Sequence, residues 1–174
     1  MYVNELMTTQ LKTCRPDSSL DDIARMMWDG DCGAIPVVTQ DNKPVGIITD
    51  RDVAMAAMLQ HRPLWDIRAA EVIGGQSLCC CNQQESVESC LQKMEQQKVR
   101  RVLITDETDA LCGILSMGDA LAFTKGKGTA KAREKVDVGN VIGMLKKVSA
   151  HHESGVLPPM HSRQSTARQP SPAM

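Results

Sequence analysis

The sequence of 174 residues has few aromatic side chains: Tyr2, Trp28, Trp65 and Phe123. A protein that stacks single-stranded bases on aromatic rings needs more of them, and needs them clustered. Its 20 lysines and arginines are balanced by 21 acids, so the basic excess typical of a dedicated nucleic-acid binder is missing as well. We therefore do not expect nucleic acid to be the main partner.

Long apolar runs are also missing. No stretch approaches the roughly 18 apolar residues of a membrane span, and the first ten residues lack the basic and apolar blocks of a secretory signal. The seven cysteines form no C-x-x-C motif, and no histidine pair lies near them at ligand spacing. These absences predict a reduced, cytoplasmic protein with no membrane contact and no metal centre, whose cysteines serve as small buried apolar residues.

What the sequence does contain is an internal repeat. A shift of 67 residues aligns residues 11–57 with a second copy without a gap, matching Gly46 to Gly113 and Asp52 to Asp119. One copy is small for a stable core, whereas two packed copies cover each other's apolar surface. We expect four segments: a first repeat at 2–62, a second repeat at 68–124, a basic helical extension at 125–150 and a disordered tail at 151–174.

Each copy has the order strand, helix, strand, strand, helix. Apolar residues at spacings of three and four predict the first helix, with a cap at Asp17 or Ser18. Two β-branched runs separated by turn residues predict a hairpin, and the strand–helix–strand order requires a right-handed crossover. The expected fold class is α/β. The expected elements are strands at 11–14, 34–39 and 45–49 and a helix at 50–59 in copy one; strands at 78–81, 101–105 and 111–116 and helices at 86–96 and 117–124 in copy two; and a last helix around 137–149.

One local pattern recurs at the same place in both copies: GIITDRD at 46–52 and GILSMGD at 113–119. A hydroxyl residue ends a strand three positions before an aspartate, at the start of a helix whose free N–H groups favour anions. A carboxylate can accept hydrogen bonds from both hydroxyls of a ribose. The same spacing is also a helix capping box that needs no ligand, and one residue can serve both roles.

The ordered set of motifs, found twice, resembles a tandem pair of cystathionine-β-synthase (CBS) domains, called a Bateman module. The stretches that carry the resemblance are LMT at 6–8, AIPVV at 34–38 and the two glycine-to-aspartate segments. It covers about residues 2–124. It implies two CBS-type β-α-β-β-α repeats packed with pseudo-two-fold symmetry and a regulatory module that binds an adenosyl nucleotide between them: AMP, ADP, ATP or S-adenosylmethionine.

By residue matching, the resemblance implies two ligand sites. In site one, Asp52 binds the ribose and Thr49 the ribose or phosphate, and the remaining residues are Lys12, Thr13, Cys32, Gly33, Ala34 and Arg51. In site two, Asp119 and Ser116 take these roles, with a wall of Cys79, Val99, Arg100 and Arg101. The two adjacent arginines would meet phosphates, since a guanidinium binds phosphate bidentately. Copy two departs from the pattern at Leu103, Met117 and Gly118, which leaves its ligand preference open.

The predicted function is non-catalytic, because no nucleophile, base and orienting group occur together in the sequence. Ligand binding would change the arrangement of the repeats, and an unidentified regulated protein would respond to it. The resemblance also implies a homodimer, with Met55–Met58 as a suitable face. Two alternatives stay open: a ligand-free docking or structural CBS protein, and a nucleic-acid contact through the basic segment 125–147.

Overall fold

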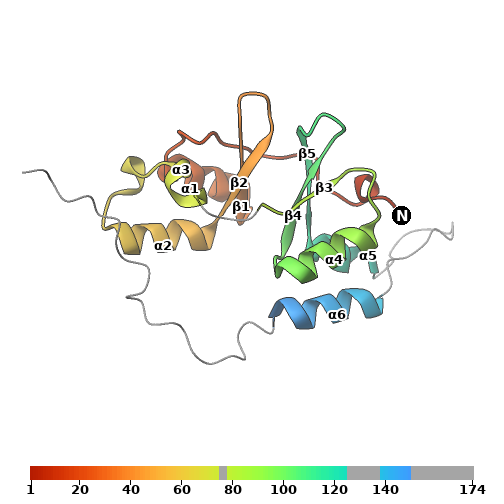
Figure 1. Cartoon of the computed structure of the whole chain (residues 1–174). Helices are drawn as coiled ribbons and strands as arrows, with labels where there is room; N and C mark the ends of the chain where they lie inside the picture. Colours follow the sequence, from red (N-terminus) through yellow and green to blue (C-terminus); the bar gives the residue numbers. More distant parts are fainter. Residues whose placement is uncertain (75–77, 125–137, 150–174) are drawn as a thin grey trace, which may run out of the picture.

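The computed structural model of the chain describes residues 1–74, 78–124 and 138–149. Figure 1 shows two halves side by side, each a small sheet flanked by helices. The first half contains α1 (Leu20–Asp29), β1 (Ala34–Val38), β2 (Pro44–Thr49), α2 (Asp50–Gln60) and α3 (Ala69–Ile73), and the second contains β3 (Cys80–Asn82), α4 (Val87–Gln97), β4 (Arg101–Thr105), β5 (Leu111–Ser116) and α5 (Met117–Thr124). Two short 3₁₀ helices, η1 (Val3–Glu5) and η2 (Leu64–Asp66), and a last helix, α6 (Val138–Ser149), complete the described structure.

The two hairpins confirm the internal repeat. In the first, β1 pairs antiparallel with β2 and places Ala34 opposite Thr49. In the second, β4 pairs with β5 in the same way and places Arg101 opposite Ser116. Each hairpin also has one register irregularity, and the two irregularities fall at equivalent positions. The α/β class and the CBS-type order of elements are thus as predicted.

The first strand of each copy differs from its predicted extent. Within 11–14 only Cys14 pairs with the sheet, in a parallel bridge to Val37. Pro36 in β1 has no N–H to donate to the carbonyl of Lys12, whereas the equivalent Leu103 donates to the carbonyl of Cys79 at 3.0 Å in copy two. In copy two the strand lies at Cys80–Asn82 rather than 78–81 and pairs in parallel with β4.

A serine side chain caps the first helix of each copy. The cap of α1 is Ser19, not Asp17 or Ser18, and its hydroxyl accepts a hydrogen bond from the N–H of Asp22. Ser86 caps α4 identically, through the N–H of Ser89. These caps satisfy N–H groups that the first turn of a helix leaves without a partner.

The segment that precedes each repeat crosses to the other half. Val3 is fully buried in the core of the second half, and its N–H donates to the carbonyl of Glu85 at 3.0 Å. Conversely, Ile67 and Ala69 are buried in the core of the first half, where the carbonyl of Ile67 accepts from the N–H of Leu20 at 2.9 Å. The two halves therefore exchange their leading segments.

A glycine makes each crossing possible. A Cβ built on Gly46 would lie 2.6 Å from Cγ2 of Ile73, and one built on Gly113 would clash with the side chain of Met7. The glycine shared by both copies therefore lets the other repeat's leading segment approach the sheet, a packing role rather than a ligand-binding one.

The sheets also meet directly. Val38, Leu103 and Leu111 form a buried apolar cluster that joins the first hairpin to the second. At its edge Asn42 and Leu111 exchange two hydrogen bonds, of 2.8 and 2.9 Å, between the two hairpins. This contact and the two crossings hold the halves as one body.

The last described helix, α6, packs on α4 and α5 (Figure 1). Its apolar residues Val141 and Val148 join the core of the second half at 0% and 3% exposure. The helix expected around 137–149 is confirmed, whereas the rest of the expected basic extension and the tail, 125–137 and 150–174, lie outside the described residues. None of the helices described is long and apolar enough to cross a membrane.

We predict that Gly46→Ala lowers the free energy of unfolding by about 1–3 kcal/mol, because the added Cβ overlaps branched atoms of Ile73 that cannot swing aside. Urea denaturation measures the change. Gly143→Ala in α6 is the control, since a Cβ there meets nothing within 4 Å and the substitution should be neutral or stabilising. Equal stability of Gly46→Ala and the wild type would contradict the close packing of Ile73 against Gly46.

Candidate functional site

The two hydroxyl–aspartate pairs have the same geometry in both halves. At the start of α2, the N–H and the hydroxyl of Thr49 donate to Oδ2 of Asp52 at 2.8 and 2.7 Å. At the start of α5, the N–H and the hydroxyl of Ser116 donate to Oδ2 of Asp119 at 2.8 and 2.6 Å. The N–H of each aspartate donates back to the hydroxyl. The pairs are therefore helix capping boxes with aspartate in the acid position.

Capping uses only one oxygen of each carboxylate. Among the described residues, no hydrogen bond reaches Oδ1 of Asp52 or Asp119. Both aspartates are half-buried. A carboxylate that caps a helix through one oxygen can accept hydrogen bonds from ribose hydroxyls through the other. Capping and ligand binding are thus compatible in the same residue.

Arg101, expected in site two, extends toward site one. Its Nη2 lies 3.5 Å from the position that a Cβ on Gly33 would take, and Oδ2 of Asp50 lies 3.4 Å from the same point. Within the part of the chain that the structure describes, Arg101 forms no ion pair. The repeat places Ala34 at the equivalent position in site one, so this cation has no counterpart in copy one.

Other site-one residues lie around the same end of β1. Ala34 begins β1 opposite Thr49, and Thr13 is half-buried one residue before the Cys14 bridge. The Lys12 ammonium donates to the carbonyl of Met26 at 3.3 Å, at the C-terminal end of α1. Arg51 is exposed on the first turn of α2, two residues after the Thr49 cap.

A pocket of about 400 Å³ opens beside this region on the helical side of the first half. It contains Cys32 and Gly33 but neither Thr49 nor Asp52. Its lining residues are Ala24, Met27, Trp28, Asp31, Cys32, Gly33, Asp50 and Val53.

The remaining site-two residues are divided between surface and core. Arg100 is exposed, and its carbonyl accepts from the N–H of Met117 at the start of α5, so it lies close to the Ser116 cap. Val99 is half-buried after the end of α4. Cys79 is only 6% exposed and packs in the core of the second half, where burial raises the pKa of its thiol to about 11. The structure does not bring the Cys79 side chain to the surface that carries Asp119.

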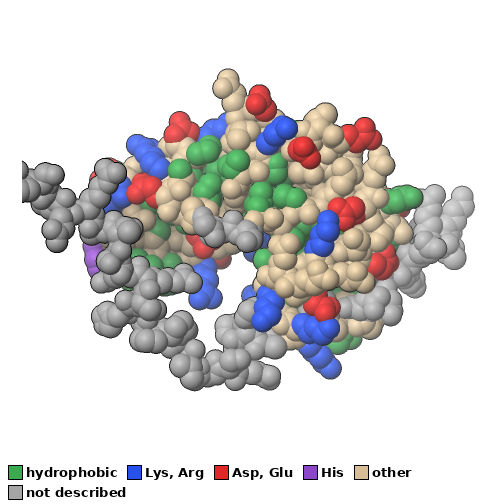
Figure 2. All heavy atoms as spheres, in the orientation of Figure 1, with side chains coloured by type: hydrophobic (Ala, Val, Ile, Leu, Met, Phe, Trp, Pro, Cys, Tyr) green, Lys and Arg blue, Asp and Glu red, His purple; other side chains and the backbone are tan. Residues whose placement is uncertain are grey.

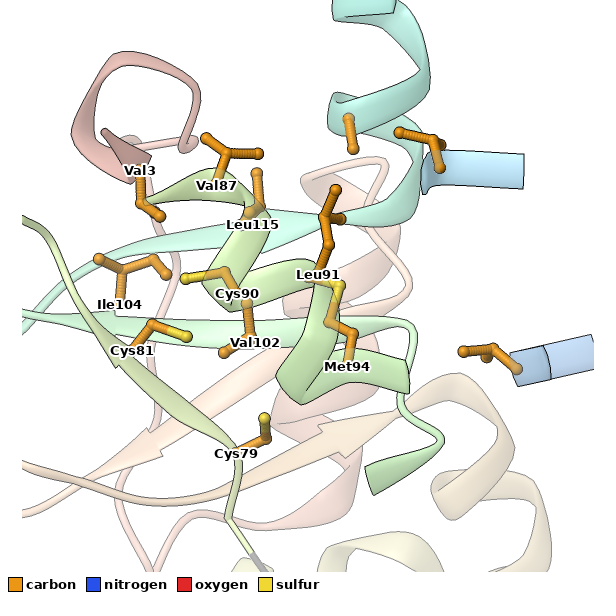
Figure 3. Packing of buried hydrophobic residues seen from close by; sticks show 13 residues of the cluster. Val3, Cys79, Cys81, Val87, Cys90, Leu91, Met94, Val102, Ile104 and Leu115 are labelled. Atoms are coloured by element: carbon orange, nitrogen blue, oxygen red, sulfur yellow. The ribbon is translucent and has the colours of Figure 1, made fainter. Parts of the chain in front are cut away.

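A cluster of two thiols and a carboxylate lies at the core of the second half, and the sequence does not indicate it. The ligand atoms of Cys81, Glu85 and Cys90 lie within 4.8 Å of one another, and Figure 3 shows Cys81 on β3 and Cys90 on α4 facing each other. A hydrogen bond from Cys90 lowers the pKa of the Cys81 thiol and raises that of Cys90. Two thiols and a carboxylate could bind a metal chemically, but the Lys93 ammonium already lies 2.8 Å from Glu85.

Charged side chains also gather where the halves meet. Figure 2 shows lysine and arginine side chains on both sides of the indentation between the two halves. The open carboxylate oxygens and this positive charge are the two features that a nucleotide, with its ribose and phosphates, requires.

Comparison with known proteins identifies the family. The CBS domain model matches residues 3–59 and 76–126, and the chain therefore belongs to the CBS domain family. A CBS domain-containing protein of Bacillus subtilis, YhcV, is 35% identical over 121 residues, which is 67% of this chain and 81% of YhcV.

Two solved structures have the same fold. One is the CBS domain pair of protein MJ0100 in complex with 5-methylthioadenosine and S-adenosyl-L-methionine, at 22% identity and a TM-score of 0.64, covering 74% of this chain and 98% of that one. The other is CBSX2 in complex with AMP, at 20% identity and a TM-score of 0.59, covering 70% and 93%. By contrast, the chain spans less than a quarter of the homoserine O-acetyltransferases that it matches.

Sequence reasoning missed the reach of Arg101 across the halves and the pocket beside Trp28. The 67-residue shift aligns equivalent positions but says nothing of contacts between copies. No local signal in the sequence could have shown either feature.

We predict that Glu85→Gln reduces stability most at neutral pH. Burial raises the pKa of Glu85, but hydrogen bonds from Lys93, Asn82 and Ser89 outweigh it and hold the pKa below its usual range. A lowered pKa means that the ionised carboxylate stabilises the fold at neutral pH and loses this effect as pH falls through the folded-state value. The difference between wild type and variant, measured by urea denaturation, should shrink as the pH falls below about 4.3, the ordinary pKa of a glutamate.

The matched control is Glu88→Gln, an exposed neighbour in the first turn of the same helix. It should change stability little at any pH. A difference for Glu85→Gln that is constant across this pH range would show that its ion pair with Lys93 contributes nothing.

Proposed function

We propose that the chain is a non-catalytic regulatory module that binds an adenosyl nucleotide between its two CBS repeats and signals to a protein partner by a change of conformation. The observation that carries the proposal is the pair of capped aspartates, Asp52 and Asp119, each fixed through one carboxylate oxygen and open at the other. Fixed acceptors of this kind suit the vicinal hydroxyls of a ribose.

The ligands of related folds support an adenosyl compound. The solved structures of similar fold contain AMP in one case and S-adenosylmethionine with 5-methylthioadenosine in the other. The three share an adenosine moiety, and with it a ribose. We therefore propose AMP, ADP, ATP or S-adenosylmethionine as the ligand of this chain.

Basic side chains near the caps would hold a phosphate. Arg101 lies beside Gly33 without an ion pair among the described residues, and Arg100 lies beside the Ser116 cap. Guanidinium groups bind phosphate bidentately. Because Arg101 extends from the second repeat to the first, a phosphate bound there would link the two halves.

A ligand that links the two halves changes their arrangement, and a protein partner responds to that change. The free energy available for signalling is the difference in ligand affinity between two arrangements of the halves, typically about 1–3 kcal/mol.

We also propose that the module works as a homodimer in the cytoplasm. All seven cysteines are free thiols, as a reducing compartment would keep them.

We predict that Asp52→Asn weakens adenosyl-nucleotide binding at site one by about tenfold or more, because the amide loses the charge that attracts ribose hydroxyls. The asparagine oxygen still accepts from Thr49, so the helix cap and the fold are kept. Isothermal titration calorimetry with AMP, ATP and S-adenosylmethionine measures the affinity. Asp119→Asn is the equivalent test for site two.

Asp41→Asn, an exposed residue in the first hairpin turn, is the charge-matched control and should bind as the wild type does. Wild-type affinity in both Asp52→Asn and Asp119→Asn would remove the aspartates from the site. No binding of any of the three nucleotides by the wild type would instead favour a ligand-free docking role.

A further inference from the structure

The core of the second repeat contains a pair of cysteines where the first repeat has a cysteine and an isoleucine. The 67-residue shift makes Cys81 equivalent to Cys14, and both are buried, at 1% and 4% exposure. Cys90 of α4 faces Cys81 of β3 (Figure 3), and its equivalent in the first repeat is Ile23. A buried cysteine on the strand is thus common to both repeats, but the fold of the repeat does not require the second thiol.

A lysine and a glutamate connect this pair with the surface. Lys93 of α4 donates a hydrogen bond to Cys81, and its ammonium lies 2.8 Å from Oε1 of Glu85. The side chains of Lys93 and Glu85 are 36% and 27% exposed. Their equivalents in the first repeat are Met26 and Ser18, which carry no charge. The charged pair is therefore a feature of the second repeat and not of the first.

The two equivalent strand cysteines differ in acidity as a result. Burial raises the pKa of Cys14 to about 11. At Cys81 the hydrogen bond from Cys90 and the ammonium of Lys93 outweigh burial, and the pKa of the thiol is lowered. The thiolate is the nucleophilic form of cysteine, and a neighbouring lysine favours it. Cys81 is therefore the more nucleophilic of the two, and a second thiol lies next to it.

We infer that Cys81 and Cys90 form a reactive dithiol that hydrogen peroxide oxidises to a disulfide, which joins β3 to α4 in the second repeat. The two sulfur atoms lie within 4.8 Å of each other, and a disulfide needs them about 2 Å apart. The bond can form by rotation of the side chains with a small shift of α4. Peroxide is small and polar, and it reaches Cys81 where the half-exposed Lys93 side chain swings out.

The oxidation takes two steps. The thiolate of Cys81 attacks one oxygen of the peroxide, the O–O bond breaks, hydroxide leaves and Cys81 becomes a sulfenic acid. The Cys90 thiol then attacks that sulfur, the S–O bond breaks and the S–S bond forms. The Cys90 proton and the sulfenic hydroxyl leave as water, and the hydroxide takes up the proton that Cys81 lost on ionisation. Two thiols are oxidised, and the peroxide is reduced to water.

The contacts of Glu85 favour a dithiol over a metal centre. Its Oε1 accepts from the N–H of Asn82 at 2.9 Å and from Lys93, and its Oε2 accepts from the hydroxyl of Ser89 at 3.0 Å. Both carboxylate oxygens are thus already engaged. Two thiolates alone do not complete the four-ligand shell of a structural zinc site, and the ammonium of Lys93 already supplies a positive charge beside them.

Peptide mapping tests the disulfide. The full chain is reduced, freed of metal with a chelator, treated with dilute hydrogen peroxide and alkylated. Cleavage after glutamate separates Cys90 from residues 79–81, so the disulfide appears as two linked peptides. The wild type should give this link, and fragmentation should place it at Cys81.

Variants of single cysteines identify the pair. Cys81→Ala and Cys90→Ala should abolish the link, and a cooperative thermal transition checks that each variant is folded. Cys80→Ala is the matched control, because Cys80 is the strand neighbour of Cys81 but packs against a different apolar cluster. It should give the link as the wild type does.

Lys93→Met tests the source of the reactivity. It introduces the residue that the first repeat has at this position, and it should slow formation of the link by about tenfold, because the ammonium that favours the thiolate is lost. Lys43→Met, at an exposed lysine of the first hairpin, is the charge-matched control and should react at the wild-type rate.

A wild type whose Cys81 and Cys90 both stay open to alkylation after denaturation overturns the inference, and this result needs no variant. A link that persists in Cys81→Ala, or an unchanged rate in Lys93→Met, also contradicts it. A metal that the chelator removes from the wild type but not from Cys90→Ala would identify a metal centre instead. Because no nucleotide is present, none of these results bears on the ligand-binding proposal.

Discussion

The exchange of leading segments between the halves is the constraint on which the structure depends. Ile73 packs against Gly46 in the first half and Met7 against Gly113 in the second, so neither half has a complete sheet surface without the segment that precedes the other repeat. Each unit alone would be small for a stable core. Because the exchange ties the halves together, it also fixes how the two capped aspartates are placed on one body.

Much of this was accessible from the sequence, for definite physical reasons. The 67-residue repeat, the hairpins and the helices follow from local periodicity and turn chemistry, and the hydroxyl–aspartate spacing indicated the caps at Thr49 and Ser116 correctly. The sequence did not show the crossing of residues 1–8 and 67–73, because that contact joins segments far apart in the chain. The strand expected at 11–14 was wrong in extent, since Pro36 in the neighbouring strand has no N–H to donate to the carbonyl of Lys12 and the ladder keeps one bridge, at Cys14.

The places where the repeats differ carry the most functional information. Both copies share the caps and the glycine crossings, which are requirements of the fold. They differ at the pair Ala34 and Arg101, which gives only the second copy a cation that extends across the halves, and at the pair Trp28 and Glu95, which gives only the second copy a partner for α6. The two copies of a duplicated fold thus differ in the charge beside their caps and in the helix face that α6 covers.

A crystal structure of the chain grown with AMP tests the central claim most directly. The account predicts the ribose hydroxyls within hydrogen-bond distance of Oδ1 of Asp52 or Asp119, with the Thr49 or Ser116 cap intact. A nucleotide bound elsewhere, with both carboxylates in contact with protein and solvent alone, would contradict it.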